Sequence, residues 1–187
     1  MTKNDAPAAC ETAILAGGCF WCLEAVFKEV NGVESVTSGY IGGRVEAPTY
    51  RQVCDGGTGH AEAVQIVFDP AVVSYRDLLE IFFVIHDPTS LNRQGNDIGT
   101  QYRSAIFALS DEQLHTALDL IEHMGEARVY PSAIVTKVER ADTFWPAEPY
   151  HHDYYANNSD QPYCQYIVAP KISKFREKFA SRRKRGG

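Results

Sequence analysis

The chain has 187 residues, of which 44% are hydrophobic and 22% are charged, and its formal net charge is −6 at pH 7. This length suits one well-packed domain, and the composition is that of an ordinary globular protein. The negative charge argues against a nucleic-acid partner, and no stretch approaches the roughly 18 apolar residues of a membrane span. Residues 1–7 also lack the apolar run of a signal peptide. We therefore expect a soluble cytoplasmic protein that binds neither nucleic acid nor membranes and acts as a monomer.

The cysteine content points in the same direction. The sequence contains five cysteines, an odd number in a chain too large to need disulfide staples. They are Cys10, Cys19, Cys22, Cys54 and Cys164. This usage indicates a reducing compartment and thiols that serve chemistry.

The first half of the chain alternates strands and helices. A short apolar strand is predicted at residues 12–16 and runs into an amphipathic helix, whose end is marked by Asn31-Gly32. The next elements are a strand at 33–40, an irregular loop at 39–48, a short turn or helix at 50–53 and a largely buried strand at 60–68.

The second half begins with a capping-box spacing at Ser74 and Asp77, which predicts the start of a buried helix that continues through residues 78–85. Ser110 and Gln113 have the same spacing before a second amphipathic helix. A long ordered loop at 89–102, a strand at 103–109 and another strand at 133–138 complete this part. These elements predict a single α+β domain with helices packed on a mixed β-sheet.

The C-terminal part changes character. Residues 144–165 are rich in aromatic residues, prolines and histidines and predict a long irregular segment. An edge strand at 166–169 and a basic helix at 171–179 are expected after it. We expect residues 1–11 to be a disordered extension and residues 180–187 to be a frayed basic tail.

One cysteine lies where a nucleophile would be activated. The sequence Gly17-Gly18-Cys19-Phe20-Trp21-Cys22 joins the first strand to the first helix, so Cys19 lies at the first turn of that helix. Free backbone N–H groups and the positive end of the helix dipole favour a thiolate there, and the thiolate is the nucleophilic form. The alternative interpretation is structural, because cysteines and aromatic residues are often simply buried.

Glu62 is the best candidate for a proton donor. It lies in an apolar strand, in the sequence Gly59-His60-Ala61-Glu62-Ala63-Val64. A carboxylate there is costly unless it is paired or its pKa is raised, and a general acid needs a raised pKa near neutral pH. The alternative is a glutamate on the solvent-facing side of an edge strand.

These motifs resemble those of a known family. Gly-Cys-Phe-Trp at a helix start, Gly-His-Ala-Glu, the run from Gln94 to Ser104 and the block from Ala147 to Tyr155 resemble, in this order, the A class of the peptide methionine sulfoxide reductases. The resemblance covers residues 12–179, the expected catalytic domain. The sequence departs from the family pattern at Cys22, where many members have glycine, and at His152, where the family has glutamine.

The resemblance implies a function in protein repair after oxidative damage. The S epimer of methionine sulfoxide, free or in a protein, is reduced to methionine while Cys19 becomes a sulfenic acid and Glu62 protonates the sulfoxide oxygen. The resemblance also implies a ferredoxin-like α/β core and no bound cofactor. The implied substrate-binding residues are Phe20, Trp21, Tyr50, Asp97 and Tyr102, with His151 as support for the site. Phe20 and Trp21 would hold the substrate methyl group.

A second thiol must then convert the sulfenic acid into a disulfide, which a dithiol protein of the thioredoxin type reduces. Cys164 matches the resolving cysteine of many family members, and its glycine- and proline-punctuated segment can move. Cys22 lies one helical turn after Cys19, so a disulfide between them needs little movement. We expect Cys164 rather than Cys22, with a relay through both as the third alternative.

Two other functions compete with this one. Cys19 and Cys22 form a C-x-x-C motif, which also occurs in general thiol–disulfide oxidoreductases. The same two cysteines with His151 and His152 would be a structural zinc site, although adjacent histidines do not have the usual spacing.

Overall fold

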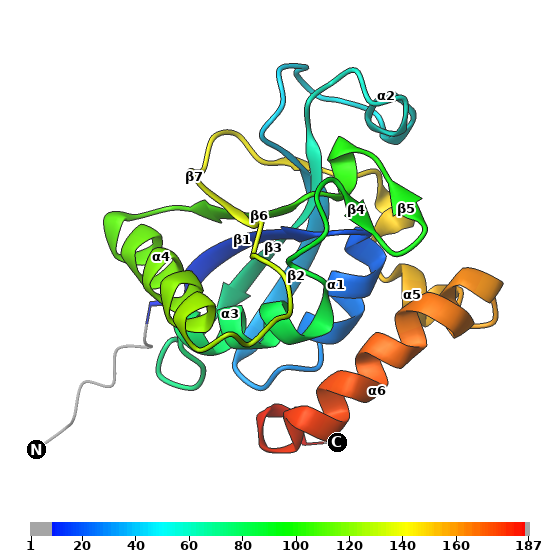
Figure 1. Cartoon of the computed structure of the whole chain (residues 1–187). Helices are drawn as coiled ribbons and strands as arrows, with labels where there is room; N and C mark the ends of the chain where they lie inside the picture. Colours follow the sequence, from blue (N-terminus) through cyan, green and yellow to red (C-terminus); the bar gives the residue numbers. More distant parts are fainter. Residues whose placement is uncertain (1–8, 186–187) are drawn as a thin grey trace, which may run out of the picture.

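The computed structural model describes residues 9–185, and its centre is one mixed β-sheet (Figure 1). The sheet has the strand order β7-β6-β1-β3-β2-β8, and only the pair of β6 and β7 is parallel. The strands are β1 (Glu11–Gly17), β2 (Val33–Ile41), β3 (Ala61–Phe68), β6 (Ser104–Ala108), β7 (Lys137–Arg140) and β8 (Trp145–Pro146). Most of the expected N-terminal extension lies outside the described residues.

The core of this sheet has the ferredoxin-like arrangement that the family resemblance implied. The helices are α1 (Phe20–Phe27), α2 (Tyr50–Cys54), α3 (Tyr75–Ile85), α4 (Asp111–Glu126), α5 (Tyr154–Asn157) and α6 (Ala169–Lys178). In sequence the core elements follow one another as β1-α1-β2-β3-α3-β6, and in space the four antiparallel strands are ordered β6-β1-β3-β2. The predicted α+β class and mixed sheet are confirmed.

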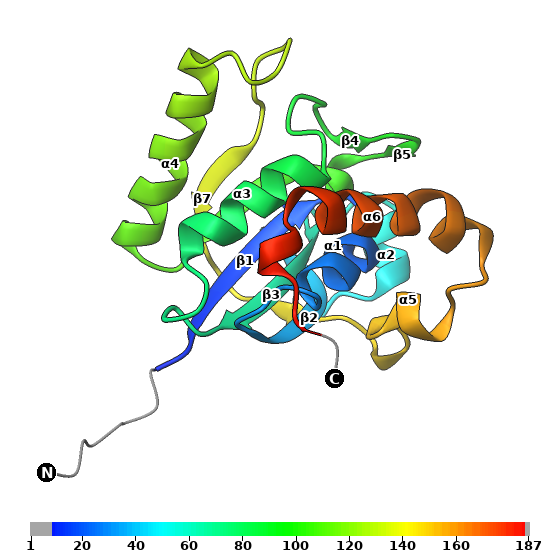
Figure 2. The ribbon, with the colours of Figure 1, turned by 90° about the horizontal axis from the view of Figure 1, so that it is seen from below.

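The two faces of the sheet are covered differently. Helices α1 and α3 pack on one face, and α6 packs on both of these helices (Figure 2). Their apolar side chains form the larger core with one face of β1, β2 and β3. The other face carries smaller residues, such as Ala16, Ala63 and Ala105, and Ala141 and Phe144 pack against it. The site described below lies at the start of α1, directly after the C-terminal end of β1.

Hydrogen bonds at the helix starts largely follow the predicted caps. The Oγ of Ser74 accepts from the backbone N–H of Asp77, whose Oδ2 accepts from the N–H of Ser74, each at 3.0 Å, so this box is confirmed. At α4 only half of the box forms. Ser110 accepts from the backbone N–H of Gln113, but the Gln113 side chain accepts from Leu109 N–H and donates to the Thr12 carbonyl, which ties α4 to β1.

Several predicted boundaries were wrong. The first helix ends at Phe27 rather than before Asn31, because Val30 forms a bridge with Arg183 instead of another helical turn. The strand expected at 133–138 begins only at Lys137. The loop at 89–102 is ordered, as expected, and contains the hairpin of β4 (Arg93–Gln94) and β5 (Asp97–Ile98) and a 3₁₀ turn at Thr100–Tyr102.

The C-terminal part differs most from prediction. The expected edge strand at 166–169 is a π-helical stretch, Cys164–Val168, that continues into α6. Its apolar run is too short to separate a strand from a helix, and helical spacing buries Val168, Ile172 and Phe175 together.

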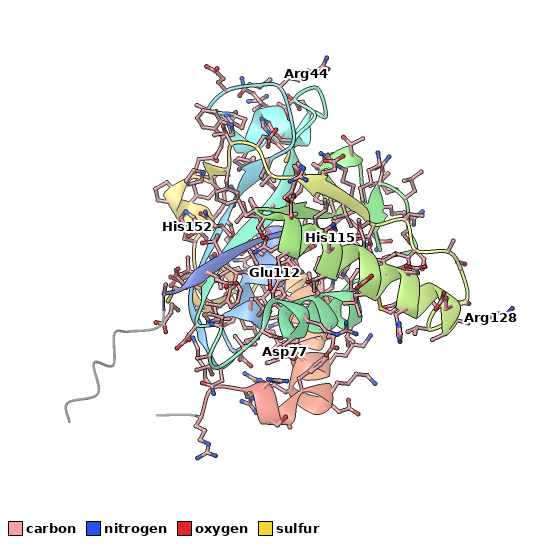
Figure 3. The ribbon with its side chains drawn as sticks, turned by 90° about the vertical axis from the view of Figure 1, so that its left-hand side faces the viewer. Arg44, Asp77, Glu112, His115, Arg128 and His152 are labelled. Atoms are coloured by element: carbon pink, nitrogen blue, oxygen red, sulfur yellow. The ribbon has the colours of Figure 1, made fainter. Side chains whose placement is uncertain are left out.

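Residues 180–184 are not a frayed tail. Ala180–Arg182 forms a 3₁₀ turn, and the Arg182 guanidinium binds Asp77 at the start of α3 at 2.9 Å (Asp77 is labelled in Figure 3). The Arg182 carbonyl accepts from Asn31 N–H at 2.7 Å, and Lys184 N–H donates to the Glu29 carbonyl at 2.8 Å. Among the described residues, no helix has the length and apolarity to cross a membrane.

Candidate active site

Cys19 immediately precedes α1, and its environment differs from the one expected. Its side chain is buried, with 8% of its surface exposed, and it makes no capping hydrogen bond. The backbone N–H of Phe20 donates to Oε1 of Glu62 at 3.1 Å, so a donor of the helix start serves the carboxyl group. Burial, with the neighbouring Cys22 and Glu62, raises the pKa of the Cys19 thiol well above its usual value. Burial therefore opposes the thiolate that the helix start favours.

Cys22, in the first turn of α1, lies beside Cys19, and the two thiols are hydrogen-bonded to each other. A hydrogen bond from Cys19 is the main cause that lowers the pKa of Cys22, against the effect of burial, and the charge of Lys171 acts in the same direction. Two thiols in contact at a helix start can form a disulfide with little movement of the chain.

Glu62 has the property that its sequence context predicted. Its side chain is 1% exposed, and burial raises its pKa to about 8, although the hydrogen bond from Phe20 N–H opposes this. At neutral pH the carboxyl group therefore retains its proton in most molecules. A buried, protonated carboxyl group next to a thiol can donate a proton to a substrate oxygen.

The hydroxyl groups of Tyr50 and Tyr102 lie near Glu62. Both side chains are half-buried, and burial together with the charge of Glu62 raises the pKa of each phenol. They therefore stay protonated and can donate hydrogen bonds. Glu148 positions Tyr50, because its Oε2 accepts from Tyr50 N–H and its Oε1 accepts from the Tyr40 hydroxyl, each at 2.9 Å.

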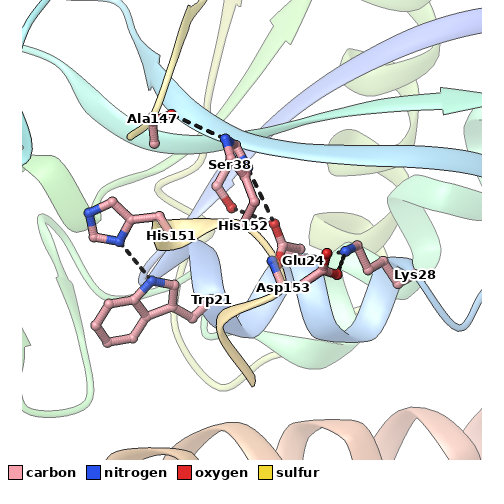
Figure 4. Close-up of polar contacts among 8 residues, drawn as sticks. All are labelled: Trp21, Glu24, Lys28, Ser38, Ala147, His151, His152 and Asp153. Atoms are coloured by element: carbon pink, nitrogen blue, oxygen red, sulfur yellow. Dashed lines mark hydrogen bonds and ion pairs between the residues drawn. The ribbon is translucent and has the colours of Figure 1, made fainter. Parts of the chain in front are cut away.

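Aromatic rings surround the start of α1. The ring of Phe20 is fully buried, and its centroid lies 6.4 Å from that of Tyr50 and 5.1 Å from that of His151. Trp21 stacks on Tyr154 with the centroids 3.7 Å apart. Figure 4 shows that its Nε1–H donates to Nδ1 of His151, at 3.0 Å. Burial lowers the pKa of His151, so the ring is neutral and accepts this bond at Nδ1.

A buried carboxylate ties the segment that carries His151 to α1. Glu24 is 2% exposed and accepts from Asp153 N–H at 2.6 Å and from the Ser38 hydroxyl at 3.1 Å (Figure 4). Nδ1 of His152 lies 3.9 Å from Glu24, and Nε2 of His152 is 3.1 Å from the Ala147 carbonyl. Glu24 therefore stabilises the turn at Asp153, whose backbone is in the left-handed region with a φ of 56°. His152, at the position of the family's glutamine, belongs to this support.

Tyr163 is a site residue that the sequence did not reveal. Its hydroxyl donates to Oδ2 of Asp97 at 2.7 Å and also lies within hydrogen-bonding reach of the two thiols, Cys19 and Cys22. Asp97 and Tyr163 are 66 residues apart and together form part of the wall of a cavity of about 370 Å³. The only signal for Tyr163 in the sequence was its position directly before Cys164.

Comparison with known proteins identifies the family. The family model for peptide methionine sulfoxide reductase matches residues 11–183. The chain belongs to the peptide methionine sulfoxide reductase family. It is 57% identical over 175 residues to "Peptide methionine sulfoxide reductase MsrA" of Deinococcus radiodurans, which covers 94% of this chain and 85% of that protein.

Solved structures of reductases share the fold. The reduced form of Mxr1 from Saccharomyces cerevisiae superposes with a TM-score of 0.78 at 36% identity, over 84% of this chain and 91% of that one. The same yeast protein, solved in complex with Trx2, has a TM-score of 0.55 at 26% identity, over 82% of this chain and 92% of that one. Family membership makes the chain an oxidoreductase that acts on methionine sulfoxide.

Within this reductase, Cys164 occupies an unexpected environment. It is fully buried at the start of the π-helical stretch rather than in a loop. Burial raises the pKa of its thiol, and the nearby Cys22 adds to this effect. The structure thus places Cys22 in contact with Cys19 and near Cys164, and all five cysteines are free.

The zinc alternative finds no support in the geometry of the reductase. Nδ1 of His151 is engaged by Trp21, and His152 faces Glu24 and Ala147. Within residues 9–185, no group of three or more His, Cys, Asp or Glu side chains is arranged to hold a metal ion.

Proposed function

We propose that this reductase converts the S epimer of methionine sulfoxide, free or within a protein, to methionine, with Cys19 as the nucleophile and Glu62 as the acid. The observation that carries the proposal is the buried Glu62 carboxyl group, which lies beside the Cys19 thiol and is held at the start of α1 by Phe20 N–H, while burial raises its pKa to about 8. A pair of this kind supplies both the attacking sulfur and the proton that the sulfoxide oxygen needs.

In the first step the substrate oxygen takes the Glu62 proton while the Cys19 sulfur attacks the positive sulfur of the sulfoxide. The proton released by the Cys19 thiol returns to Glu62. Oxygen is transferred to Cys19, which becomes a sulfenic acid, and methionine leaves. Because the pKa of the Cys19 thiol is high, the thiol loses its proton only when a substrate is bound. Its deprotonation then accompanies the transfer of the Glu62 proton to the sulfoxide oxygen.

The aromatic residues would select the substrate. The phenol hydroxyls of Tyr50 and Tyr102 donate hydrogen bonds to the S–O group, while Phe20 and Trp21 form the apolar niche for the methyl group. Asp97 and Tyr163 close the other side of Cys19. Support for these roles comes from the position of each side chain around the start of α1, described above.

We propose a relay for the second step. The Cys22 thiol attacks the Cys19 sulfenic acid, so that a disulfide forms and water is released. The Cys164 thiol then attacks the Cys22 sulfur of this disulfide, so that a disulfide between Cys22 and Cys164 forms and the Cys19 thiol is released. The contact between Cys19 and Cys22 and the position of Cys164 near Cys22 support this order. It makes Cys22 the first partner and Cys164 the second.

A dithiol protein of the thioredoxin type would complete the cycle. Its first thiolate attacks the disulfide and forms a mixed disulfide, and its second thiol releases the reduced chain and leaves with the oxidising equivalents. The Trx2 complex of the yeast relative supports this partner. The cycle needs no bound cofactor. The free thiols support a cytoplasmic location, and a monomer is proposed as the acting unit because one chain supplies every group of the site.

A single-turnover experiment tests the function. The reduced protein is mixed with one equivalent of each sulfoxide epimer without reductant, and methionine is quantified while the protein mass is recorded. We expect one methionine per chain from the S epimer, none from the R epimer, and a protein that has lost two hydrogens. Cys19→Ser is the control and should release no methionine. Insulin disulfide reduction at a comparable rate, without sulfoxide reduction, would favour the general oxidoreductase instead.

A further inference from the structure

A groove leads away from the reactive thiols along α6. The cavity of about 370 Å³ that Cys19 and Cys22 line adjoins a wider groove of about 800 Å³, and the two share Gln94, Gly95, Pro170 and Lys171 as lining residues. The wider groove, here called the α6 groove, is bounded by α6, by the end of α3 and by residues 129–131. Figure 2 shows α6 beside α3, with the β4–β5 hairpin near the N-terminal end of α6.

One side of the α6 groove is basic. Lys171, Lys174 and Lys178 all line it, and their spacing places them on the same side of α6. Within residues 9–185 none of the three forms an ion pair, whereas Arg176 of the same helix binds Glu29 at 2.5 Å. The one acidic residue of the lining, Asp87, accepts hydrogen bonds from Thr89 and Ser90. The chain has a net charge of −6, so this row of lysines is a positively charged patch on a protein that is negatively charged as a whole.

The groove also exposes apolar surface. Val129 is 56% exposed and lies with Tyr130 and Pro131 on the wall that faces the lysines. At the end near the thiols, Tyr166 is 75% exposed and lines the adjoining cavity. Exposed apolar side chains next to unpaired charges indicate a surface that another protein covers.

We propose that the α6 groove is the docking surface for an acidic face of the thioredoxin-type protein that reduces the disulfide, an inference that rests on the function proposed above. The alternative occupant, the polypeptide around the oxidised methionine, fits less well. The α6 groove itself is lined by none of the residues that surround the bound sulfoxide, namely Cys19, Glu62, Tyr50, Tyr102 and Asp97. Through the adjoining cavity the groove leads to Cys22, one of the two sulfurs of the disulfide that the reductant would open.

Docking there would aid the exchange in two ways. Three lysines attract an acidic partner and raise its rate of association, an effect that added salt weakens. Once bound, the partner's thiolate meets a disulfide sulfur from the side of α6, while the sulfoxide side of Cys19 remains free. Reductant and substrate would then occupy different faces of the same reactive centre.

The test separates the two half-reactions. Lys174→Glu and Lys178→Glu are assayed for methionine release in a single turnover, for turnover with dithiothreitol, and for turnover with an acidic thioredoxin, its reductase and NADPH. We expect the KM for thioredoxin to rise by about three- to tenfold in each variant and further in the double variant. The single-turnover rate and the turnover with dithiothreitol should stay within about twofold of the wild type.

Lys137→Glu is the matched control, because it makes the same charge change at an exposed position on β7 that does not line the groove. It should leave the KM for thioredoxin unchanged. An unchanged KM in both α6 variants would refute the docking surface, and so would a raised KM for a sulfoxide-containing peptide with an unchanged KM for thioredoxin. Absence of methionine release from the wild type would instead refute the proposed function, and the docking inference with it.

Discussion

The carboxyl group of Glu62 accepts a hydrogen bond from the backbone N–H of Phe20, the residue next to the reactive Cys19, at 3.1 Å. This bond joins β3 to the start of α1 and fixes the acid beside the nucleophile. It also places the polar end of the helix opposite a carboxyl group whose pKa burial has raised to about 8. The reactive pair is therefore organised around a proton held by Glu62.

Replacement of Glu62 should remove the proton donor and retain the fold. Glu62→Gln keeps an oxygen that can accept from Phe20 N–H, so the site should stay assembled. We expect the single-turnover rate of methionine release to fall by roughly 10²- to 10⁴-fold. In the wild type the rate should decline as the pH rises through about 8, where Glu62 loses its proton. A stopped-flow pH series checks this, and a variant with the wild-type rate and profile would exclude Glu62 from the mechanism.

The same proton should make stability depend on pH. The folded chain releases it near pH 8, whereas the unfolded chain releases it near the ordinary glutamate value of 4.5. Between these values the folded state binds more protons, so the free energy of unfolding falls as the pH rises, by at most about 1.4 kcal/mol per pH unit. Glu62→Gln should lack this contribution and gain stability over the wild type from pH 5 to pH 8. Urea unfolding at several pH values measures the difference, and parallel curves for the two proteins would contradict it.

Glu24 offers a test of the support behind His151. Glu24→Ala leaves the N–H of Asp153 and the hydroxyl of Ser38 without their acceptor, and we expect a loss of about 1–3 kcal/mol in the free energy of unfolding. The KM for methionine sulfoxide should rise as well, because the turn that carries His151 also holds Trp21. Glu80→Ala is the control, since Glu80 is exposed and its pair with Arg76 contributes little. Equal stability of the two variants in denaturant titrations would show that the buried carboxylate is dispensable.

Much of the fold could be predicted because the spacing of apolar residues in its strands and helices is visible in the sequence. Alternation in β2 and the apolar run of β3 locate strands, and the Ser74 and Asp77 spacing locates the start of α3. The short apolar run after Cys164 could not be assigned this way, because only the packing of α6 on α1 and α3 decides that it is helical.

The chemistry of the site was only partly predictable, for a similar reason. The raised pKa of Glu62 follows from one carboxyl group in an apolar strand, which is a local feature of the sequence. The raised pKa of Cys19 depends mainly on its burial, which arises from the packing of segments that are distant in sequence. Tyr163 and Glu148 escaped notice because their partners, Asp97 and Tyr50, are distant in sequence.

The order of the thiols gives the last prediction. Cys22 contacts Cys19, and Cys164 is buried near Cys22, so the first disulfide should join Cys19 to Cys22. Peptide mapping of a Cys164→Ser variant after one turnover should find this disulfide in nearly every molecule, formed at the wild-type rate. Cys22→Ser should retain sulfoxide reduction but accumulate the sulfenic acid, which a dimedone label detects, because Cys164 must move before it can reach Cys19. A matched Cys10→Ser variant, which removes an exposed thiol outside the relay, should behave as the wild type. Rapid formation of a disulfide between Cys19 and Cys164 in Cys22→Ser would instead show that Cys164 resolves the sulfenic acid directly.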